Sequence, residues 1–351
     1  MKKIKSWSLI FALVTMAVCG AAMAFAAEPV TIAVSIRSMS SEYHMQYVAG
    51  AQAFVDTLPE GAAKVQILPC EADDNKQIND IKTLVASNSN VVILVDPNNA
   101  PNVTSIAEAC EEAGVYWVSF WNTPEGITPL SYKYWVHHQT LDGEAQGYDI
   151  AVSLFKSFKT PGKGKILVME GMMANTANEE RVKGLKRALA EYPDIEILDD
   201  QSANWDTNEG LALMETWLAK YDDIDGVWSA SDGMSLGVVQ ALKAVGLEGK
   251  VGVTGVDGFK DAIDAVGAGT MTNSYVNNGW LQGGYAAAWA YAAYTGKIKV
   301  DELDAGHRMF FTEGYLVTKD TYPDYIKNFV DNPPVYDYSN LDFCIKGPMP
   351  Q

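Results

Sequence analysis

Short apolar runs alternate with longer amphipathic stretches along the chain from Thr31 onward. The pattern predicts strands at Thr31 to Ile36 and Val65 to Leu68, and helices at Met45 to Leu58 and Asn75 to Ser87. Alternation of this kind is typical of βαβ units, in which successive strands lie parallel in one sheet.

The alternation continues without a break through the first third of the chain. Val91 to Val95 is an uninterrupted apolar run, as expected of a strand that helices cover on both faces. Pro101 to Ala113 predicts the next helix, which Gly114 would end, and Val115 to Phe120 closes this series. The stretch from Trp121 to Ser131 contains two prolines and a glycine, and we predict a loop there.

A second series of the same kind follows. Its predicted strands are Lys165 to Met169, Ile195 to Asp199, Gly226 to Ser229 and Val251 to Val256. Its predicted helices are Asp142 to Phe158, Glu179 to Glu191, Asn208 to Lys220, Met234 to Val245 and Lys260 to Val266. A further helix is expected at Gly279 to Tyr294 and a last strand at Phe310 to Val317, whereas the Pro- and Tyr-rich tail after Asn332 has no assignment. The chain is therefore predicted to be α/β, with two doubly wound parallel sheets.

The first residues read as an export signal. Three lysines precede an apolar stretch from Ser8 to Ala22, and small residues follow, so that cleavage is expected near Ala27 and the mature protein in the periplasm. The stretch is shorter than the roughly 20 residues that cross a bilayer. A lipid anchor on Cys19 is the alternative, but the bulky Val18 precedes that cysteine where lipoprotein signals carry a small residue.

The charge and the cysteine content argue against several classes of partner and of site. The chain has 26 Lys and Arg against 44 Asp and Glu, and loss of the three lysines of the signal would move the net charge from −18 to −21. Nucleic acid and anionic membranes are therefore poor partners. Cys70, Cys110 and Cys344 lack the close spacing of zinc sites, so we expect buried thiols, no metal and no cofactor. About 325 mature residues suggest two domains.

Two such sheets imply where a ligand would bind. In open parallel sheets, ligands lie beyond the carboxyl ends of the strands, so two sheets that face each other form a cleft lined by strand-end loops. The residues directly after each strand therefore matter most.

These strand ends and the adjoining helices carry motifs in a characteristic order. They are Gly50-Ala51-Gln52, Asp73 with Gln77, Asp96-Pro97, Arg181-Val182-Lys183-Gly184-Leu185, Ser231-Asp232-Gly233-Met234-Ser235-Leu236-Gly237, and Gly255-Val256-Asp257-Gly258. With these motifs, from about Thr31 to about Lys319, the chain resembles the ribose-binding type of periplasmic sugar-binding protein, with the type I binding-protein fold.

The resemblance implies two lobes joined by a three-strand hinge. The crossings are expected near His137 to Thr140, near Tyr275 to Asn278, and near the Phe310 to Val317 strand. The N-terminal lobe would comprise residues 28–137 and 278–309, the C-terminal lobe residues 138–277 and 310–330, and the tail residues 331–351, after a signal peptide of residues 1–27.

In the N-terminal lobe, the resemblance implies ligand contacts from five residues. Tyr43 and His44 hold the place of the family's aromatic pair, and an aromatic face suits the C–H side of a sugar ring. Asp96 would accept hydroxyl protons. Trp121 and Asn122 depart from the family, which usually has an Asp-Arg pair there that clamps ring hydroxyls, so ribose itself is in doubt.

In the C-terminal lobe, the resemblance implies five more. Arg181 matches the family's cleft arginine, whose fork donates to two adjacent hydroxyls. Trp205 falls at the second stacking ring, Asp257 at the acid after the Gly255 strand, Asn277 at the amide on a crossover strand, and Ser231 where the family commonly has Asn.

Five of these residues also have a structural reading. Arg181 matches the cleft role in both motif and spacing, with a surface pair to Glu179 or Glu180 as the alternative, and Asp257 is also compatible with a helix N-cap. Asp96 is compatible with a bond in the turn before Pro97, and both Trp121 and Trp205 with core packing.

Two further features stand apart from these ten residues. His137-His138 looks like a metal or catalytic pair, but adjacent strand residues point to opposite faces, which favours a hinge crossing. Arg37, just after the first strand, is a secondary candidate for the cleft or its rim.

The function predicted from these residues is capture for import. The protein would be the solute-binding component of an ABC importer, would close on a monosaccharide or polyol, and would deliver it to a membrane permease as a monomer. The alternatives are a ligand-binding sensor protein for a chemoreceptor or sensor kinase, and an enzyme acting on a sugar. The chain has no GxxxxGK[ST] phosphate loop, which disfavours the enzyme.

Overall fold

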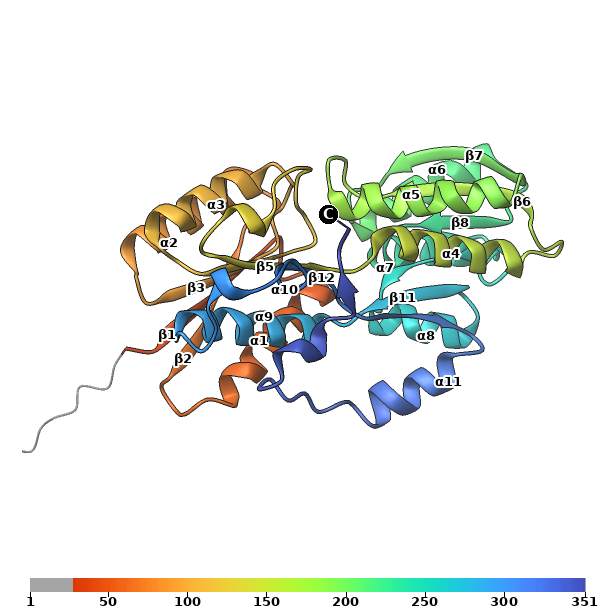
Figure 1. The fold of residues 1–351 in the computed structure, drawn as a ribbon. Coiled ribbons are helices and arrows are strands. Elements are labelled where there is room, and N and C mark those ends of the chain that lie inside the picture. Colours follow the sequence, from red (N-terminus) through yellow and green to blue (C-terminus); the bar gives the residue numbers. More distant parts are fainter. Residues whose placement is uncertain (1–27, 351) are drawn as a thin grey trace, which may run out of the picture.

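The computed structural model describes residues 28–350. The signal peptide, its cleavage near Ala27 and the lipid anchor on Cys19 concern positions outside the described residues. Two α/β lobes lie side by side, the first at the left and the second at the right of Figure 1. Within residues 28–350, no helix is long and apolar enough to cross a membrane.

The first lobe is built on a seven-stranded sheet in the order β14-β12-β5-β4-β3-β1-β2. Its strands are β1 (Val30–Ile36), β2 (Ala63–Pro69), β3 (Val91–Val95), β4 (Trp117–Phe120), β5 (Trp135–Thr140), β12 (Met309–Phe311) and β14 (Gly347–Pro348). All pairs are parallel except β12 with β14. Its helices are α1 (Glu42–Asp56), α2 (Asp74–Ser87), α3 (Asn102–Ala113), α9 (Gly279–Tyr294) and the short α10 (Ala305–Arg308), with 3-10 turns η1 (Pro129–Ser131), η2 (Val300–Glu302) and η4 (Leu341–Cys344).

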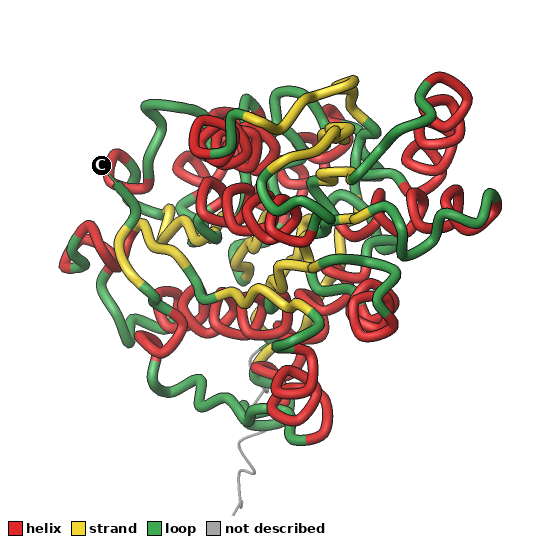
Figure 2. Tube along the Cα trace, turned by 90° about the vertical axis from the view of Figure 1, so that its right-hand side faces the viewer, coloured by secondary structure: helices red, strands yellow, loops and turns green. Residues whose placement is uncertain are grey.

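The uninterrupted apolar run of β3 is explained by helices on both faces. Ile93 packs in one core cluster with Ile81 of α2 and Val103 of α3, whereas Val92 and Leu94 pack in the other cluster with Tyr47 of α1. Because side chains alternate along a strand, both faces of β3 must be apolar. Figure 2 shows the strands inside and the helices outside.

The second lobe contains two sheets, in the orders β7-β6-β8-β9 and β10-β11-β13. Its strands are β6 (Lys163–Glu170), β7 (Asp194–Ser202), β8 (Gly226–Ser229), β9 (Gly252–Val253), β10 (Val256–Asp257), β11 (Asn273–Asn277) and β13 (Gly314–Thr318). Its helices are α4 (Gly143–Ser157), α5 (Thr176–Glu191), α6 (Thr207–Lys220), α7 (Asp232–Ala244), α8 (Lys260–Ala268) and the short α11 (Tyr322–Tyr325), which continues into a π turn, η3 (Ile326–Asp331). The predicted α/β class with two wound lobes is confirmed.

The predicted strand from Val251 to Val256 is interrupted between β9 and β10. The Asp232 carboxylate lies against Gly255, where a Cβ would come within 2.0 Å of Asp232 Oδ1. The same carboxylate accepts the backbone N–H groups of Gly258 (2.7 Å) and Phe259 (2.8 Å). The strand therefore bends around the buried Asp232 carboxylate. Only a glycine at position 255 allows the carboxylate to lie so close to the backbone.

The crossings between the lobes differ in detail from the expected boundaries. Strand β5 stays in the first sheet through Thr140, because Phe311 of β12 still pairs with that residue, so the chain crosses later than position 137. The predicted strand Phe310 to Val317 is two strands, β12 in the first lobe and β13 in the second. Strand β12, the parallel partner of β5, thus ends before the chain crosses to the second lobe. Strand β13, the antiparallel partner of β11, begins after that crossing.

The tail forms a fourth passage between the lobes. After α11 in the second lobe, the chain returns to the first lobe and ends in β14, the outer strand of the large sheet (Figure 1). Tyr338 of the tail packs on α9, where a Cβ on Gly284 would lie 2.4 Å from its ring. Asn278 Nδ2 donates to Tyr336 Oη at 2.7 Å. Tyr338 and Cys344 of the tail are therefore part of the core of the first lobe, whereas most of the described tail residues are exposed.

The His137-His138 pair is core structure on β5. Both side chains are 0% exposed, and burial lowers the pKa of each to about 3, because the charged imidazolium is disfavoured away from water. His138 Nδ1 lies 2.8 Å from Ser119 Oγ, and the His137 ring packs on Phe310. Within residues 28–350, no group of His, Cys, Asp and Glu is arranged to hold a metal. Cys70, Cys110 and Cys344 are buried free thiols, as predicted.

The close approach of helices α1 and α9 depends on Gly283, and this contact leads to a first prediction. A Cβ on Gly283 would lie 1.9 Å from the carbonyl oxygen of Tyr47, so Gly283→Ala should force the helices apart and lower the free energy of unfolding by about 1–3 kcal/mol. Thermal denaturation checks this, with Gly347→Ala as the control, because no atom lies within 4 Å of a Cβ there. Equal melting temperatures for the two variants would contradict the close contact.

Candidate functional site

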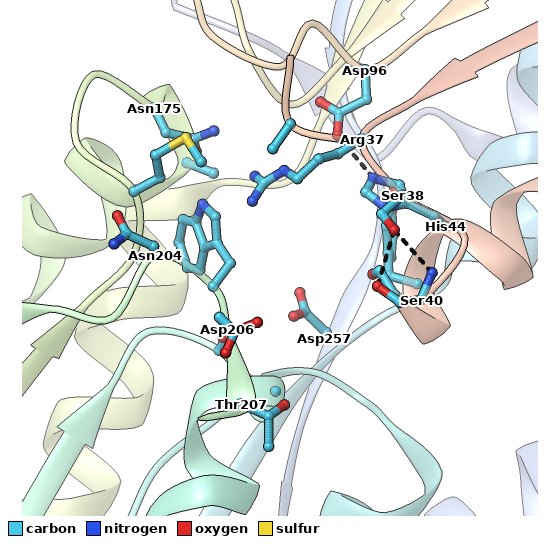
Figure 3. Close-up of a pocket in the computed structure, with 18 of the residues that line it drawn as sticks. Arg37, Ser38, Ser40, His44, Asp96, Asn175, Asn204, Asp206, Thr207 and Asp257 are labelled. Carbon is cyan, nitrogen blue, oxygen red and sulfur yellow. Dashed lines mark hydrogen bonds and ion pairs between the residues drawn. The ribbon is translucent and has the colours of Figure 1, made fainter. Parts of the chain in front are cut away.

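A cavity of about 700 Å³ lies between the lobes and is lined by loops from both of them (Figure 3). These loops follow the carboxyl ends of the strands, where the sequence placed the ligand. Nine of the ten predicted residues line the cavity: Tyr43, His44, Asp96, Trp121, Asn122, Arg181, Trp205, Ser231 and Asp257. The tenth, Asn277, lies behind Asp257 and donates to its Oδ1 at 3.0 Å.

His44 and Asp96 form a pair on the wall of the first lobe (Figure 3). His44 Nε2 lies 2.9 Å from Asp96 Oδ2, and both residues are buried. Asp96 Oδ1 also accepts from Asn122 Nδ2 at 3.3 Å. The Asp96 side chain bonds to neighbouring side chains, and it lines the cavity with acceptor capacity left over.

The hydroxyl of Tyr43 is held by a residue of α9. This hydroxyl donates to Gln282 Oε1 on α9, and Gln282 Nε2 in turn donates to Thr312 Oγ1, next to the third crossing, at 2.5 Å. Burial raises the pKa of Tyr43 well above its ordinary value, so the phenol stays neutral. Its ring meets the Trp121 ring edge-on, with centroids 5.4 Å apart.

Asn122 bridges the two lobes. Its Nδ2 donates to the Pro97 carbonyl at 2.8 Å, and its Oδ1 accepts the backbone N–H of Thr176, in the second lobe, at 3.0 Å. Thr176 Oγ1 also donates to the Thr123 carbonyl at 3.0 Å. Both ends of the Asn122 amide are thus engaged by protein groups, although the side chain borders the cavity.

Arg181 of α5 is a deeply buried side chain of the site. It is 2% exposed, and its guanidinium lies over the rings of Trp121 and Trp205, 5.1 and 5.5 Å from their centroids. Its Nη1 donates to the Ala230 carbonyl at 2.7 Å. The alternative of a surface pair is wrong, because Glu180 instead pairs with Lys183 on the exposed side of the helix.

A closed ring of polar contacts joins Arg181 to Asp257. Arg181 Nε donates to Gln146 Oε1 (3.2 Å), and Gln146 Nε2 donates to Asn277 Oδ1 (2.7 Å). Asn277 donates to Asp257, whose Oδ1 lies 3.8 Å from Arg181 Nη2. Gln146 was not identified from the sequence, and it orients the amide of Asn277.

Burial and charge act in opposite directions on Asp257. Burial raises its pKa to about 6, and the nearby Arg181 guanidinium partly offsets that rise. Asp257 does not cap α8, whose N-cap residue is Phe259. Ser231, in contrast, is the N-cap of α7, with its hydroxyl 3.5 Å from Met234 N. The half-buried Trp205 ring packs on Gly171, which leaves its other face toward Arg181.

Unusual backbone conformations gather around the cavity. Among residues 28–350, every non-glycine residue with positive φ except Ala174 lines it: Glu71, Ala72, Trp121, Asn204, Trp205 and Asp257. Such conformations cost roughly 1–3 kcal/mol each and persist only where the surroundings impose them. The loops are therefore held in set shapes that present Trp121, Trp205 and Asp257 to the cavity.

Several lining residues were absent from the sequence prediction. Asn175, Asn204 and Asp206 lie at the ends of β6 and β7, and Phe259 follows β10 (Figure 3). Their positions after strands were the available signal. The secondary candidate Arg37 lies inside the cavity, with its guanidinium pointing across it toward the second lobe.

Comparisons with known proteins agree with this arrangement. Residues 32–298 match the family model described as a periplasmic binding protein domain. The chain is 32% identical to a xylitol-binding protein of Mycolicibacterium smegmatis, over 51% of this chain and 53% of that protein. It is 28% identical to a putative rhizopine-binding protein of Rhizobium meliloti, over 84% of this chain and 92% of that one.

A solved structure is similar over almost the whole chain. It is that of a twin-arginine translocation pathway signal protein from Burkholderia phytofirmans, with 33% identity and a TM-score of 0.87. The similarity covers 92% of this chain and 99% of that one.

The contact between Arg181 and Asp257 generates a prediction about titration. The Asp257 carboxyl should titrate near pH 6, and Arg181→Met should raise its pKa further, because the guanidinium favours the carboxylate. Carbon-detected NMR of labelled aspartate checks this. Arg187→Met is the control, since Arg187 pairs with Glu144 on the surface. A pKa near 4 for Asp257, or a pKa that Arg181→Met leaves unchanged, would contradict this geometry.

Proposed function

We propose that this chain, which belongs to the periplasmic binding protein family, is the solute-binding component of an ABC importer and captures a monosaccharide or polyol between its lobes. The observation that carries the proposal is the interlobe cavity itself. Charged donors, carboxylate acceptors and aromatic rings line it, and they come from both lobes.

The lining suits a ligand with many hydroxyls. Arg181 lines the cavity, and its Nη2 lies 3.8 Å from Asp257 Oδ1, whereas Asp96 and Asp257 have acceptor oxygens for hydroxyl protons. The rings of Tyr43 and Trp205 offer apolar surface for C–H groups. One relative is named for xylitol, an open-chain polyol, which is consistent with a site that has lost the family's Asp-Arg pair.

Closure is supported by direct contacts between the lobes. Thr176 bonds to Asn122 and Thr123 at one rim, and Glu42 of α1 accepts the Lys260 N–H, at 3.1 Å, at the other. Contacts of this kind stabilise the closed state, which then offers a permease a surface composed of both lobes. Buried polar groups give specificity, because an analogue that lacks one hydroxyl leaves a partner unsatisfied.

The proposal has further parts. The protein is exported to the periplasm with cleavage near Ala27, acts as a monomer, and releases its ligand unchanged rather than turning it over. Presentation of the closed form to a chemoreceptor is compatible with the same cycle of closure.

Loss of the Arg181 guanidinium should weaken ligand binding. Isothermal titration with pentoses, hexoses, pentitols and inositols should find a ligand for the natural protein, and Arg181→Met should weaken it by about 100-fold, because several charge-assisted bonds are lost. Arg187→Met on the same helix serves as the matched control. The proposal fails if the natural protein binds no member of the panel.

Thr176 should favour closure without touching the ligand. Thr176→Val removes the hydroxyl that bonds to Thr123, so we expect affinity to fall about threefold to tenfold. Small-angle scattering should show a larger radius of gyration for the variant at a subsaturating ligand concentration. Thr216→Val, on the exposed side of α6, is the control. An unchanged affinity would show that this contact does not contribute to closure.

A further inference from the structure

Arg37 stands out among the arginines of the chain. Arg181, Arg187 and Arg308 each donate to protein acceptors, and Arg308 bonds four backbone carbonyl oxygens. Among the described residues, no acceptor bonds to the Arg37 guanidinium, no carboxylate forms an ion pair with it, and its Nε is buried without a partner. The Arg37 side chain is partly exposed to the cavity, and its buried Nε–H calls for an acceptor oxygen.

The carboxylates around Arg37 are engaged elsewhere. Asp96 contacts His44 and Asn122, and Asp257 contacts Asn277 and Arg181. Their charges favour the cation at a distance, but neither supplies it with a hydrogen bond. The Arg37 guanidinium points into the cavity, toward the second lobe (Figure 3).

Strand register places Arg37 beside Asp96. Ser35 of β1 pairs with Val95 of β3, so the two residues follow the ends of adjacent parallel strands. An acid and an arginine are thus presented together at the cavity wall. At the end of β4, where the resemblance leads one to expect such a pair, Trp121 packs on Arg181 and Asn122 bridges the lobes.

We propose that Arg37 is a ligand-binding residue that donates two parallel hydrogen bonds to adjacent hydroxyl oxygens of a neutral sugar or polyol, with Asp96 as the acceptor beside it. The inference rests on the proposed function and names the group of the ligand that is recognised. Arg37 and Arg181 then hold the ligand from the two lobes, each with its own carboxylate nearby.

The charge balance of the cavity favours a neutral diol over a carboxylate. Both offer two adjacent oxygens to a guanidinium. The acids that line the cavity outnumber its two arginines: Glu71, Asp96, Asp206, Glu209 and Asp257. A sugar acid would meet this negative potential, whereas an uncharged diol would not.

The test compares Arg37→Met and Arg37→Lys with the natural protein by isothermal titration. The probes are xylitol, D-ribose, myo-inositol, the deoxy analogues of the best binder, and its aldonic or uronic acid. We expect Arg37→Met to weaken the best binder by about 10- to 100-fold. Arg37→Lys should restore little, because an ammonium lacks the planar fork.

The deoxy analogues identify the group that Arg37 contacts. At least one should bind the natural protein about tenfold more weakly than the parent compound, yet lose little more in Arg37→Met, because the bond is already absent. Arg187→Met is the control for the loss of a guanidinium outside the cavity. Melting curves confirm the fold, and if Arg37→Met melts early, Arg37→Lys carries the test with the same expected loss.

The outcomes separate this inference from the function. If the natural protein binds a sugar or polyol that Arg181→Met loses while both Arg37 variants stay within twofold, Arg37 is not a ligand residue and the function stands. If the acid binds more tightly than the neutral compound, the neutral class is wrong. If nothing in the panel binds, both proposals fail.

Discussion

The Arg181 guanidinium connects the two lobes of this protein. It lies against Trp121 of the first lobe and Trp205 of the second, and it bonds to the backbone after β8. A buried cation is tolerated only with partners on several sides, and here aromatic faces, a carbonyl, Gln146 and Asp257 share that task. Separating the lobes would move Trp121 away from Arg181. The position of Trp121 and the hydration of the Arg181 guanidinium therefore change together.

The rest of the fold presents these side chains. Helices α4 and α5 approach so closely that a Cβ on Gly147 would lie 1.9 Å from the Arg181 carbonyl oxygen, which fixes the helix that carries the guanidinium. In the cavity loops, Trp121, Trp205 and Asp257 have positive φ, a backbone conformation that these residue types rarely adopt. The rigid packing behind the cavity holds these strained loops. Precise placement of donors is therefore obtained at some cost in stability.

Much of this arrangement was predictable from the sequence, because strand ends of parallel sheets converge whatever the loops contain. Arg181, Trp205 and Asp257 were identified through the resemblance to sugar-binding proteins, at positions near strand ends, and all three line the same cavity. The structural roles were not predictable. Asn122 bridges to Thr176, Gln146 acts from a helix interior, and Arg37 reaches inward, because these depend on side-chain directions across distant segments. The passage of the tail back to the first sheet left no periodic signal, since it depends on isolated contacts, such as Tyr338 on Tyr285 of α9, and on the two-residue strand β14.

The central claim is that the ligand binds between the guanidinium groups of Arg37 and Arg181 and is enclosed by both lobes. A crystal structure of the protein with the tightest-binding sugar or polyol tests it most directly. Ligand oxygens should lie within hydrogen-bond distance of Arg181 and Asp257 from the second lobe and of Arg37 from the first, with a ring of Tyr43 or Trp205 against C–H groups. A ligand that contacts one lobe alone, or one bound outside the cavity, would contradict the account.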